Sequence, residues 1–422
     1  MSSNKFFPNK PVPPQKLVGR KSEISIIFDQ INNRGHVAIH GSSGMGKSSL
    51  LQYIKSRHFW DDKGLNFSEA LIVYHNCEGL FTPNSFWQEI LQELKNEAEG
   101  DTDLQGKIDD VLKLETIEIR DIRRILKQIG KREKFLLLLL DDYHGILRTR
   151  EDYNKGEPKS TEMEAFLSGL RNLAVHNTEG QYFSTVVAAF QKVDELGPEI
   201  PRGGSPWYNH YLYVDLEPFS KKDIDNYFFN TYGHFFISIP DNLQKEKVLE
   251  MTGGYPILLQ RAGYIFSQSD RDIDINTFKA EFKNQTEYIF KDIWRELTVG
   301  EQQLLQLVVI DNFNGKVSGK LYAVDDIDKV FREHRSKLTT LQQKGVIYKN
   351  PEQNKYNFSS SLMQDLVVKE FCESISDPKK RKIFLDLYFG KMTTQQRDQV
   401  KEFSPFLMKI AQSIIKLLSI EI

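Results

Sequence analysis

Apolar residues in the first half of the chain fall into short continuous runs, separated by segments in which they recur at helical spacing. The continuous runs are typical of buried strands and cover residues 36–40, 70–77, 135–140, 182–190 and 211–219. Between them, apolar residues three or four positions apart predict helices at residues 23–34, from 47 onward, and at 84–99, 121–130 and 160–175. Because strands that alternate with helices form βαβ units, the pattern predicts an α/β fold with a doubly wound parallel sheet.

The pattern changes in the second half of the chain. Residues 218–290 contain helical patterns only, and Ser220 and Asp223 predict a capping box at the first helix. A second capping box, predicted at Thr298 and Glu301, begins a segment in which helices precede two short strands and a last helix. This order is that of a winged helix-turn-helix. We therefore expect an all-α lid followed by a winged-helix domain.

The length, charge and cysteine content of the chain argue against several classes of protein. A chain of 422 residues exceeds the usual size of one hydrophobic core, so several domains are expected. The net charge of −2 argues against a uniformly basic nucleic-acid-binding protein. Cys77 and Cys372 are far apart and match no zinc or disulfide pattern. The N-terminus lacks the apolar core of a signal peptide, and the longest apolar run is too short to cross a bilayer. We therefore expect a cytoplasmic protein with no membrane partner.

One loop carries a specific chemical signal. Its sequence matches the pattern G-x-x-x-x-G-K-[ST] and lies between an apolar strand and an amphipathic helix. The glycines let successive backbone N–H groups point at one anion, and the helix adds the positive end of its dipole. Lys47 is expected to reach the β- and γ-phosphates of ATP, and the Ser48 hydroxyl to bind Mg²⁺. The expected ATP-binding residues of this phosphate loop are Gly41, Ser42, Ser43, Gly44, Met45, Gly46, Lys47, Ser48 and Ser49.

Two acidic residues, Asp141 and Asp142, end the leucine-rich strand. A carboxylate at the C-terminal end of a buried strand beside a phosphate loop is where Mg²⁺ needs a ligand, so Asp141 is expected to bind the metal with Ser48. Asp142 is expected to polarise the water that attacks ATP, which makes Lys47, Asp141 and Asp142 the candidate catalytic residues of an ATPase. A solvated turn is the alternative for the two aspartates. Gln191 is either a sensor of the γ-phosphate or an ordinary exposed glutamine.

The motifs occur in a characteristic order, namely LVGRKSEI at 17–24, GSSGMGKSS at 41–49, LLLLLDD at 136–142, SPWYNHYLYVDLEPFSKKDI at 205–224 and MTGGYPILLQRAG at 251–263. In this order the chain resembles the STAND-type ATPases of the AAA+ superclass, especially their archaeal-ATPase-like branch. The resemblance covers about residues 17–375. It implies that Val18, Gly19 and Arg20 pack around the adenine of ATP. It also implies that Pro256, in the helical lid, closes on the base from the other side and that the winged helix moves with nucleotide state.

The resemblance implies an ATP-dependent molecular switch. ATP and Mg²⁺ would bias the lid and winged helix between two arrangements, one of which exposes a surface for a protein partner or for self-assembly, and slow hydrolysis to ADP would reset them. Two departures from the family are evident. Such ATPases usually carry superstructure-forming sensor repeats and an effector domain, which we do not expect within these 422 residues, and no residue stands out as an arginine finger.

Two other functions remain open. The chain is alternatively a DNA-binding AAA+ regulator of the origin-recognition or transposition-regulator type, in which the winged helix holds DNA. The cations that would line such a groove have acidic neighbours, which reduce the net positive charge of this region. These cations are Arg332, His334, Arg335, Lys337, Lys344, Lys349 and Lys355. In a third interpretation, the chain is a binding module in which ATP has a structural role only. This interpretation requires that Asp142 takes no part in ATP hydrolysis.

These patterns divide the chain into five predicted regions. They are an extended Pro-rich arm at 1–16, a P-loop ATPase core at 17–217, a helical lid at 218–290, a winged helix at 291–376 and a helical tail at 377–422.

Overall fold

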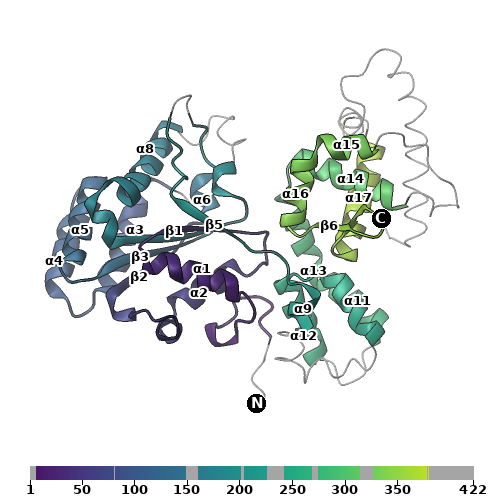
Figure 1. The fold of residues 1–422 in the computed structure, drawn as a ribbon, viewed down its shortest axis with the longest axis horizontal. Coiled ribbons are helices and arrows are strands. Elements are labelled where there is room, and N and C mark those ends of the chain that lie inside the picture. Colours follow the sequence, from purple (N-terminus) through teal and green to yellow (C-terminus); the bar gives the residue numbers. More distant parts are fainter. Residues whose placement is uncertain are drawn as a thin grey trace, which may run out of the picture. The chain divides into compact units, whose positions relative to one another are not determined.

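The computed structural model describes residues 6–79, 81–148, 160–200, 204–225, 242–268, 274–313, 327–377 and 379 (Figure 1). The chain divides into two units. The N-terminal unit comprises Asn9–Gly41 and Gly46–Leu216, and the C-terminal unit comprises Met1–Pro8, Ser42–Met45 and Glu217–Ile422. The predicted tail, from 380 onward, lies outside the described residues. Within the described ranges no helix has the length and apolar character needed to cross a bilayer.

A five-stranded parallel sheet forms the centre of the N-terminal unit, which confirms the predicted α/β fold. Its strands are β1 (His36–His40), β2 (Ala70–Asn76), β3 (Phe135–Asp141), β4 (Phe183–Ala189) and β5 (Tyr211–Asp215). They lie in the order β2-β3-β4-β1-β5, and all neighbours are parallel. Every residue of β3 is buried, as expected for a central strand covered on both faces. The C-terminal ends of β1, β4 and β3 therefore lie side by side at one edge.

Helices cover both faces of this sheet (Figure 1). Helices α1 (Lys21–Asn32) and α2 (Lys47–Lys55) pack on one face, and α3 (Pro83–Glu97), α5 (Ile119–Gly130) and α8 (Ser160–Arg171) pack on the other. Each buries a stripe of apolar residues at helical spacing, such as Ile122, Ile125, Leu126 and Ile129 of α5. Shorter segments include α6 (His144–Leu147), a π-helical turn at Asn172–His176, and 3-10 turns at Pro14–Lys16, Arg57–Phe59, Asp61–Lys63, Phe67–Glu69, Thr178–Tyr182 and Val193–Glu195.

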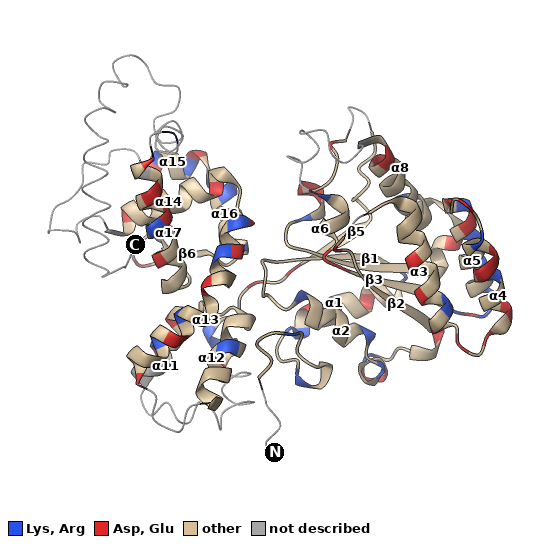
Figure 2. Ribbon diagram, turned by 180° about the vertical axis from the view of Figure 1, so that it is seen from behind, with Lys and Arg blue, Asp and Glu red and all other residues tan. Residues whose placement is uncertain are grey.

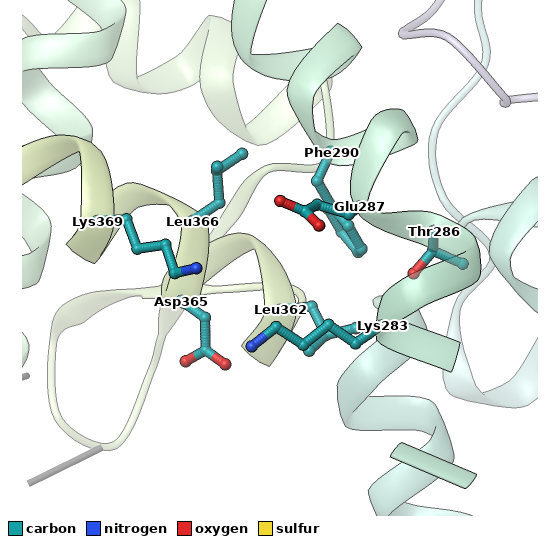
Figure 3. Close-up of a pocket in the computed structure, with 8 residues that line it drawn as sticks. All are labelled: Lys283, Thr286, Glu287, Phe290, Leu362, Asp365, Leu366 and Lys369. Carbon is teal, nitrogen blue, oxygen red and sulfur yellow. The ribbon is translucent and has the colours of Figure 1, made fainter. Parts of the chain in front are cut away.

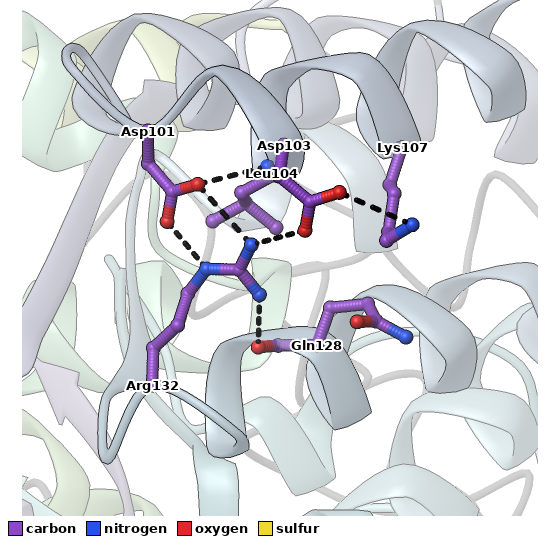
Figure 4. Close-up of polar contacts among 6 residues, drawn as sticks. All are labelled: Asp101, Asp103, Leu104, Lys107, Gln128 and Arg132. Carbon is purple, nitrogen blue, oxygen red and sulfur yellow. Dashed lines mark hydrogen bonds and ion pairs between the residues drawn. The ribbon is translucent and has the colours of Figure 1, made fainter.

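Helix α4 (Thr102–Leu112) was not expected from the sequence pattern. Asp101 caps its first turn by accepting a hydrogen bond from the backbone N–H of Leu104 at 2.9 Å. Arg132, which follows α5, binds the carboxylates of both Asp101 and Asp103 (Figure 4). Hydrogen bonds from this guanidinium hold the pKa of both carboxyls below the usual range. This surface network joins the start of α4 to the end of α5.

The C-terminal unit is helical apart from one hairpin in its described residues. Its helices are α9 (Lys221–Asp223), α11 (Asn242–Thr252), α12 (Pro256–Gln268), α13 (Ile275–Arg295), α14 (Val299–Phe313), α15 (Ile327–Glu333), α16 (Arg335–Gln343) and α17 (Ser361–Ser376), and its strands are β6 (Ile347–Asn350) and β7 (Lys355–Phe358). Both predicted capping boxes form, at Ser220 with Asp223 and at Thr298 with Glu301. The helices and hairpin follow the order expected of a winged helix, and that assignment remains a prediction. Helix α13 runs through the predicted boundary at residue 290.

The N-terminal segment packs onto both units. Phe6 is buried in the C-terminal unit, where its ring fills the space that a side chain at Gly263 would need. The backbone N–H of Phe7 donates to the side chain of Gln260 at 2.9 Å. In the N-terminal unit, Val12 donates its backbone N–H to Ser49 Oγ at 3.0 Å. The described part of the predicted Pro-rich arm is thus held by contacts at residues 6, 7 and 12, which its sequence did not indicate.

Candidate nucleotide-binding site

The phosphate loop joins β1 to α2. Gly46 has φ +92°, a left-handed conformation that favours glycine, and it brings the chain into α2 at Lys47. Lys47 is buried, and its Nζ donates a hydrogen bond to the carbonyl oxygen of Gly41 at 2.7 Å. Its ammonium is therefore held across the loop, on the side where the first N–H groups of α2 lack helical partners. This arrangement suits an anion such as a phosphate.

The two serines that follow Lys47 have different surroundings. Ser48 is partly buried, and no hydrogen bond from its hydroxyl to another described residue is present. Ser49 is buried, and its hydroxyl oxygen already accepts the N–H of Val12. Ser48 is therefore the better placed of the two to offer an oxygen to a metal ion.

The tip of the loop, Ser42–Met45, belongs to the C-terminal unit. Gly44 has φ +80°, and a Cβ there would overlap the side chain of Ile257. The tip is held by hydrogen bonds from Ser42 Oγ to Lys344 O at 3.2 Å, from the Ser43 N–H to Glu296 Oε2 at 3.3 Å, and from the Ile257 N–H to Gly44 O at 3.1 Å. Within this unit, Ile257 contacts the loop tip, and it directly follows the segment Gly254-Tyr255-Pro256.

Asp141 lies at the C-terminal end of β3 and is 1% exposed. The Tyr74 hydroxyl donates to its Oδ2 at 2.8 Å, and the backbone N–H of Asp142 donates to its Oδ1 at 3.1 Å. Tyr74 reaches it because β2 pairs with β3 in parallel register, which places Tyr74 opposite Leu139. Burial, and next the Asp141 charge, raise the pKa of the Tyr74 phenol, so it stays protonated as a donor.

Asp142 has a strained backbone, with φ +48°. Asparagine and aspartate tolerate this region better than other non-glycine residues, and such strain concentrates at functional sites. The side-chain amide of Asn76, the last residue of β2, donates to Asp142 Oδ2 at 3.2 Å. Burial, and next the charge of Asp141, raise the pKa of the Asp142 carboxyl, while Lys47 opposes the rise. The charges of Lys47, Asp141 and Asp142 therefore act on one another.

His144 follows the two aspartates at the start of α6, and sequence reasoning had missed it. Burial, and next the charge of Lys47, lower its pKa to about 4, so the imidazole is neutral at pH 7. Its ring packs edge-on against Phe190, with the centroids 4.6 Å apart. Gln191 comes next along the chain, two residues after β4, and is partly exposed. Its position between the ends of β1 and β3 keeps it a candidate γ-phosphate sensor.

The residues predicted to hold the adenine lie at the start of α1 and α12. Gly19 and Arg20 both have positive φ, +71° and +59°, and form the sharp turn before α1. Arg20 pairs with Glu23 at 3.1 Å. Val18 precedes this turn in the N-terminal unit, and Pro256 is the first residue of α12 in the C-terminal unit. Their roles toward adenine remain predictions.

The donor set of the N-terminal unit fits a magnesium–nucleotide complex. Mg²⁺ prefers a few oxygen ligands from hydroxyls, carboxylates and phosphates. Ser48 supplies a hydroxyl at the start of α2, and Asp141 supplies a carboxylate at the end of the neighbouring β3. The cation of Lys47 and the glycine-lined backbone suit the phosphates. Tyr74 and Asn76 escaped the sequence analysis because only the sheet order places them beside the two aspartates.

Two of the cations proposed to line a DNA groove are used inside the C-terminal unit. Lys344 is buried and pairs with the buried Glu301 at 2.8 Å, and Lys355 pairs with Asp311 at 2.8 Å. Because Lys344 is buried, its assignment to a DNA surface is wrong, whereas Lys355, whose side chain is 39% exposed, remains a candidate. Arg261, on α12, donates to Pro8 O and to the Tyr288 hydroxyl within the same unit. Figure 2 shows basic and acidic positions mixed along the helices of each unit.

A small cavity lies between α13 and α17 in the C-terminal unit (Figure 3). Its volume of about 30 Å³ has room for water molecules but not for a nucleotide. Burial raises the pKa of Asp365 in its wall, against the charges of nearby lysines. The cavity is lined by Lys283, Thr286, Glu287, Phe290, Leu362, Asp365, Leu366 and Lys369.

Known protein families and solved structures resemble parts of this chain. A family model described as AAA ATPase domain matches residues 16–175. The chain is similar to the solved Walker-type ATPase of Pyrococcus abyssi, with 14% identity and a TM-score of 0.53 over 85% of this chain and 98% of that chain. It is also similar to the Aeropyrum pernix ORC2 protein in its ADPNP–ADP complexes, with 11% identity and a TM-score of 0.48 over 89% and 99% of the two chains. No curated protein sequence gives a significant match. Residues 16–175 thus match the AAA ATPase domain family, and they lie in the unit that forms the predicted doubly wound α/β fold.

Proposed function

We propose that this chain binds ATP with Mg²⁺, hydrolyses it slowly, and acts as a nucleotide-dependent molecular switch of the STAND type. The observation that carries the proposal is that Lys47, in the loop after β1, and Asp141, at the C-terminal end of β3, are both buried at the same edge of the parallel sheet. A buried lysine in a glycine-rich loop and a buried carboxylate at a nearby strand end are the groups that phosphoryl transfer requires. Their grouping supports an ATPase more than a site that only stores nucleotide.

Different side chains of the N-terminal unit have different roles in binding and hydrolysing ATP. Lys47 stabilises negative charge on the β- and γ-phosphates. Asp142 orients the attacking water and accepts its proton, and Asn76 keeps the Asp142 carboxylate in one direction. Ser48 and Asp141 hold Mg²⁺, which when bound neutralises phosphate charge. Because no arginine finger is apparent in the sequence, we expect slow turnover.

Within the C-terminal unit, the lid and the predicted winged helix are joined by direct hydrogen bonds. The Tyr255 hydroxyl donates to the carbonyl oxygen of Lys344 at 2.9 Å, and Ser360 Oγ donates to that of Met251 at 2.5 Å. These bonds tie both ends of the loop before α12 to the segments that flank the hairpin. We therefore expect both parts to respond together to nucleotide state and to expose a surface for a protein partner or for self-assembly.

Equilibrium binding tests the nucleotide part of this proposal. Titration calorimetry with ATP and MgCl₂ should give saturable binding to the full chain, and Lys47→Ala should abolish it because the phosphates lose their buried cation. Lys113→Ala, at an exposed position just after α4, is the matched control and should bind as the parent does. Equal affinity of the Lys47→Ala variant and the parent would contradict the phosphate-loop assignment.

DNA binding is the second candidate function, and the exposed cations of the predicted winged helix favour it. Arg332, Arg335, Lys337 and Lys349 are all exposed on α15, α16 and β6. Binding of a fluorescent DNA duplex, measured over a series of salt concentrations with and without ATP, separates the two functions. Affinity that falls steeply with salt and is lost in Arg335→Glu/Lys337→Glu would support this candidate. If no DNA binding is detected at any salt concentration, with or without ATP, this result would contradict the DNA-binding function and favour a switch that acts on a protein partner.

A further inference from the structure

Tyr74 links the phosphate-loop helix to the carboxylate at the end of β3. Its hydroxyl donates to Asp141 Oδ2 at 2.8 Å. The ring is partly buried, and Nζ of Lys55, on α2, lies 5.9 Å from its centroid. Side chains of α2, β2 and β3 thus meet around Tyr74.

Both oxygens of the Asp141 carboxylate have a donor from this chain. Oδ2 accepts from Tyr74, and Oδ1 accepts from the backbone N–H of Asp142. Two donors on opposite oxygens define the rotation of the carboxylate plane, while each oxygen keeps a further lone pair. The backbone donor cannot be removed by mutation of a side chain, whereas the Tyr74 donor can.

We propose that Tyr74 is a positioning residue for magnesium: its hydroxyl holds Asp141 in the orientation that receives the metal of a magnesium–nucleotide complex. This inference rests on the proposed function. Outer-shell donors that orient a metal-binding carboxylate typically contribute about 10–100-fold to metal affinity. The effect of Tyr74 falls on the metal and not on the phosphates, because the phenol contacts Asp141 and none of the phosphate-loop residues in the described contacts.

The test measures magnesium dependence without catalysis. The non-hydrolysable analogue AMPPNP is bound to the full chain at a series of MgCl₂ concentrations, and in EDTA, and its affinity is read by calorimetry. Tyr74→Phe removes one hydroxyl and keeps the ring. We expect the magnesium concentration at half effect to rise about tenfold in this variant, with the affinity in EDTA unchanged.

Tyr53→Phe is the matched control, because Tyr53 lies on α2 and its ring stacks on Phe59 away from Asp141. It should leave the magnesium midpoint unchanged. A Tyr74→Phe midpoint equal to that of the parent, in a parent that binds AMPPNP in a magnesium-dependent way, would overturn the role of Tyr74 alone. A parent that binds no AMPPNP at any magnesium concentration would overturn both this role and the proposed function.

Discussion

The side-chain amide of Asn76 donates a hydrogen bond to Asp142 Oδ2 at 3.2 Å, joining the end of β2 to the residue after β3. Because Asp142 is the proposed base, this bond orients the group that takes the proton of water. We predict that Asn76→Ala lowers kcat for ATP hydrolysis about tenfold and leaves ATP affinity unchanged. Steady-state phosphate release and calorimetry measure the two quantities. Asn96→Ala, at an exposed position of α3, is the control, and equal kcat in both variants would contradict the orienting role.

Gly145 lies in the turn that carries Asp142 and His144. A Cβ at this position would overlap the backbone carbonyl oxygen of Cys77, which has little freedom to move. We therefore predict that Gly145→Ala lowers the free energy of unfolding by about 1–3 kcal/mol. Gly106→Ala in the exposed interior of α4 meets no atom and should instead stabilise the fold by about 0.5–1 kcal/mol. Urea denaturation of both variants checks the opposite signs.

Much of the N-terminal unit follows from the sequence pattern, for identifiable physical reasons. The five strands are apolar runs with sharp polar ends, and the phosphate loop needs glycines and a lysine at set spacing. Side chains that contact residues of a neighbouring strand have no such pattern in the sequence. Tyr74 and Asn76 look like ordinary strand residues until β2 is placed beside β3. Helix α4 was missed because Gly106 and a high density of acidic residues weaken its apolar pattern.

The second unit shows a different limit of sequence reasoning. Capping boxes at Ser220 and Thr298 were predictable because they depend on residues three positions apart. Lys344 was misassigned to a DNA surface because a lysine at the end of a helix is usually exposed. Its partner Glu301 is 43 residues away in sequence, so only the fold reveals the buried pair.

Two buried histidines predict acid sensitivity. Burial, and next the charge of His210, lower the pKa of His36 to about 3, and burial lowers that of His210 to about 4. Unfolded histidines protonate near pH 6.5, so the unfolded state binds more protons below that pH. The free energy of unfolding is therefore retained above pH 6.5 and should fall toward pH 4, by up to about 1.4 kcal/mol per pH unit for each group. Urea denaturation across this range measures the slope.

Substitution of one histidine tests whether it causes the dependence of the free energy of unfolding on pH. His210→Gln should make the dependence on pH shallower because one neutral buried imidazole is removed. His58→Gln, at an exposed position, should leave it as in the parent. Equal slopes in the parent and His210→Gln would show that His210 does not contribute.

The Lys344–Glu301 pair predicts a marked asymmetry between single and double substitutions. Lys344→Met leaves the carboxylate of Glu301 buried without its counter-ion, and we expect the free energy of unfolding to fall by about 3 kcal/mol. Glu301→Gln in the same chain removes the charge while keeping a capping side chain, so the double variant should regain part of the loss. Urea denaturation of the full cycle provides the coupling energy. A double variant as unstable as the sum of the singles would show that the pair is not coupled.

Asp142→Asn provides the most direct test of the central claim that this site hydrolyses ATP through a protein base. The substitution keeps the shape of the side chain and removes its capacity to accept a proton. In single-turnover experiments with excess protein and radiolabelled ATP, we predict unchanged ATP affinity and a hydrolysis rate reduced by about 100-fold or more. Hydrolysis by Asp142→Asn at the rate of the parent would contradict the account.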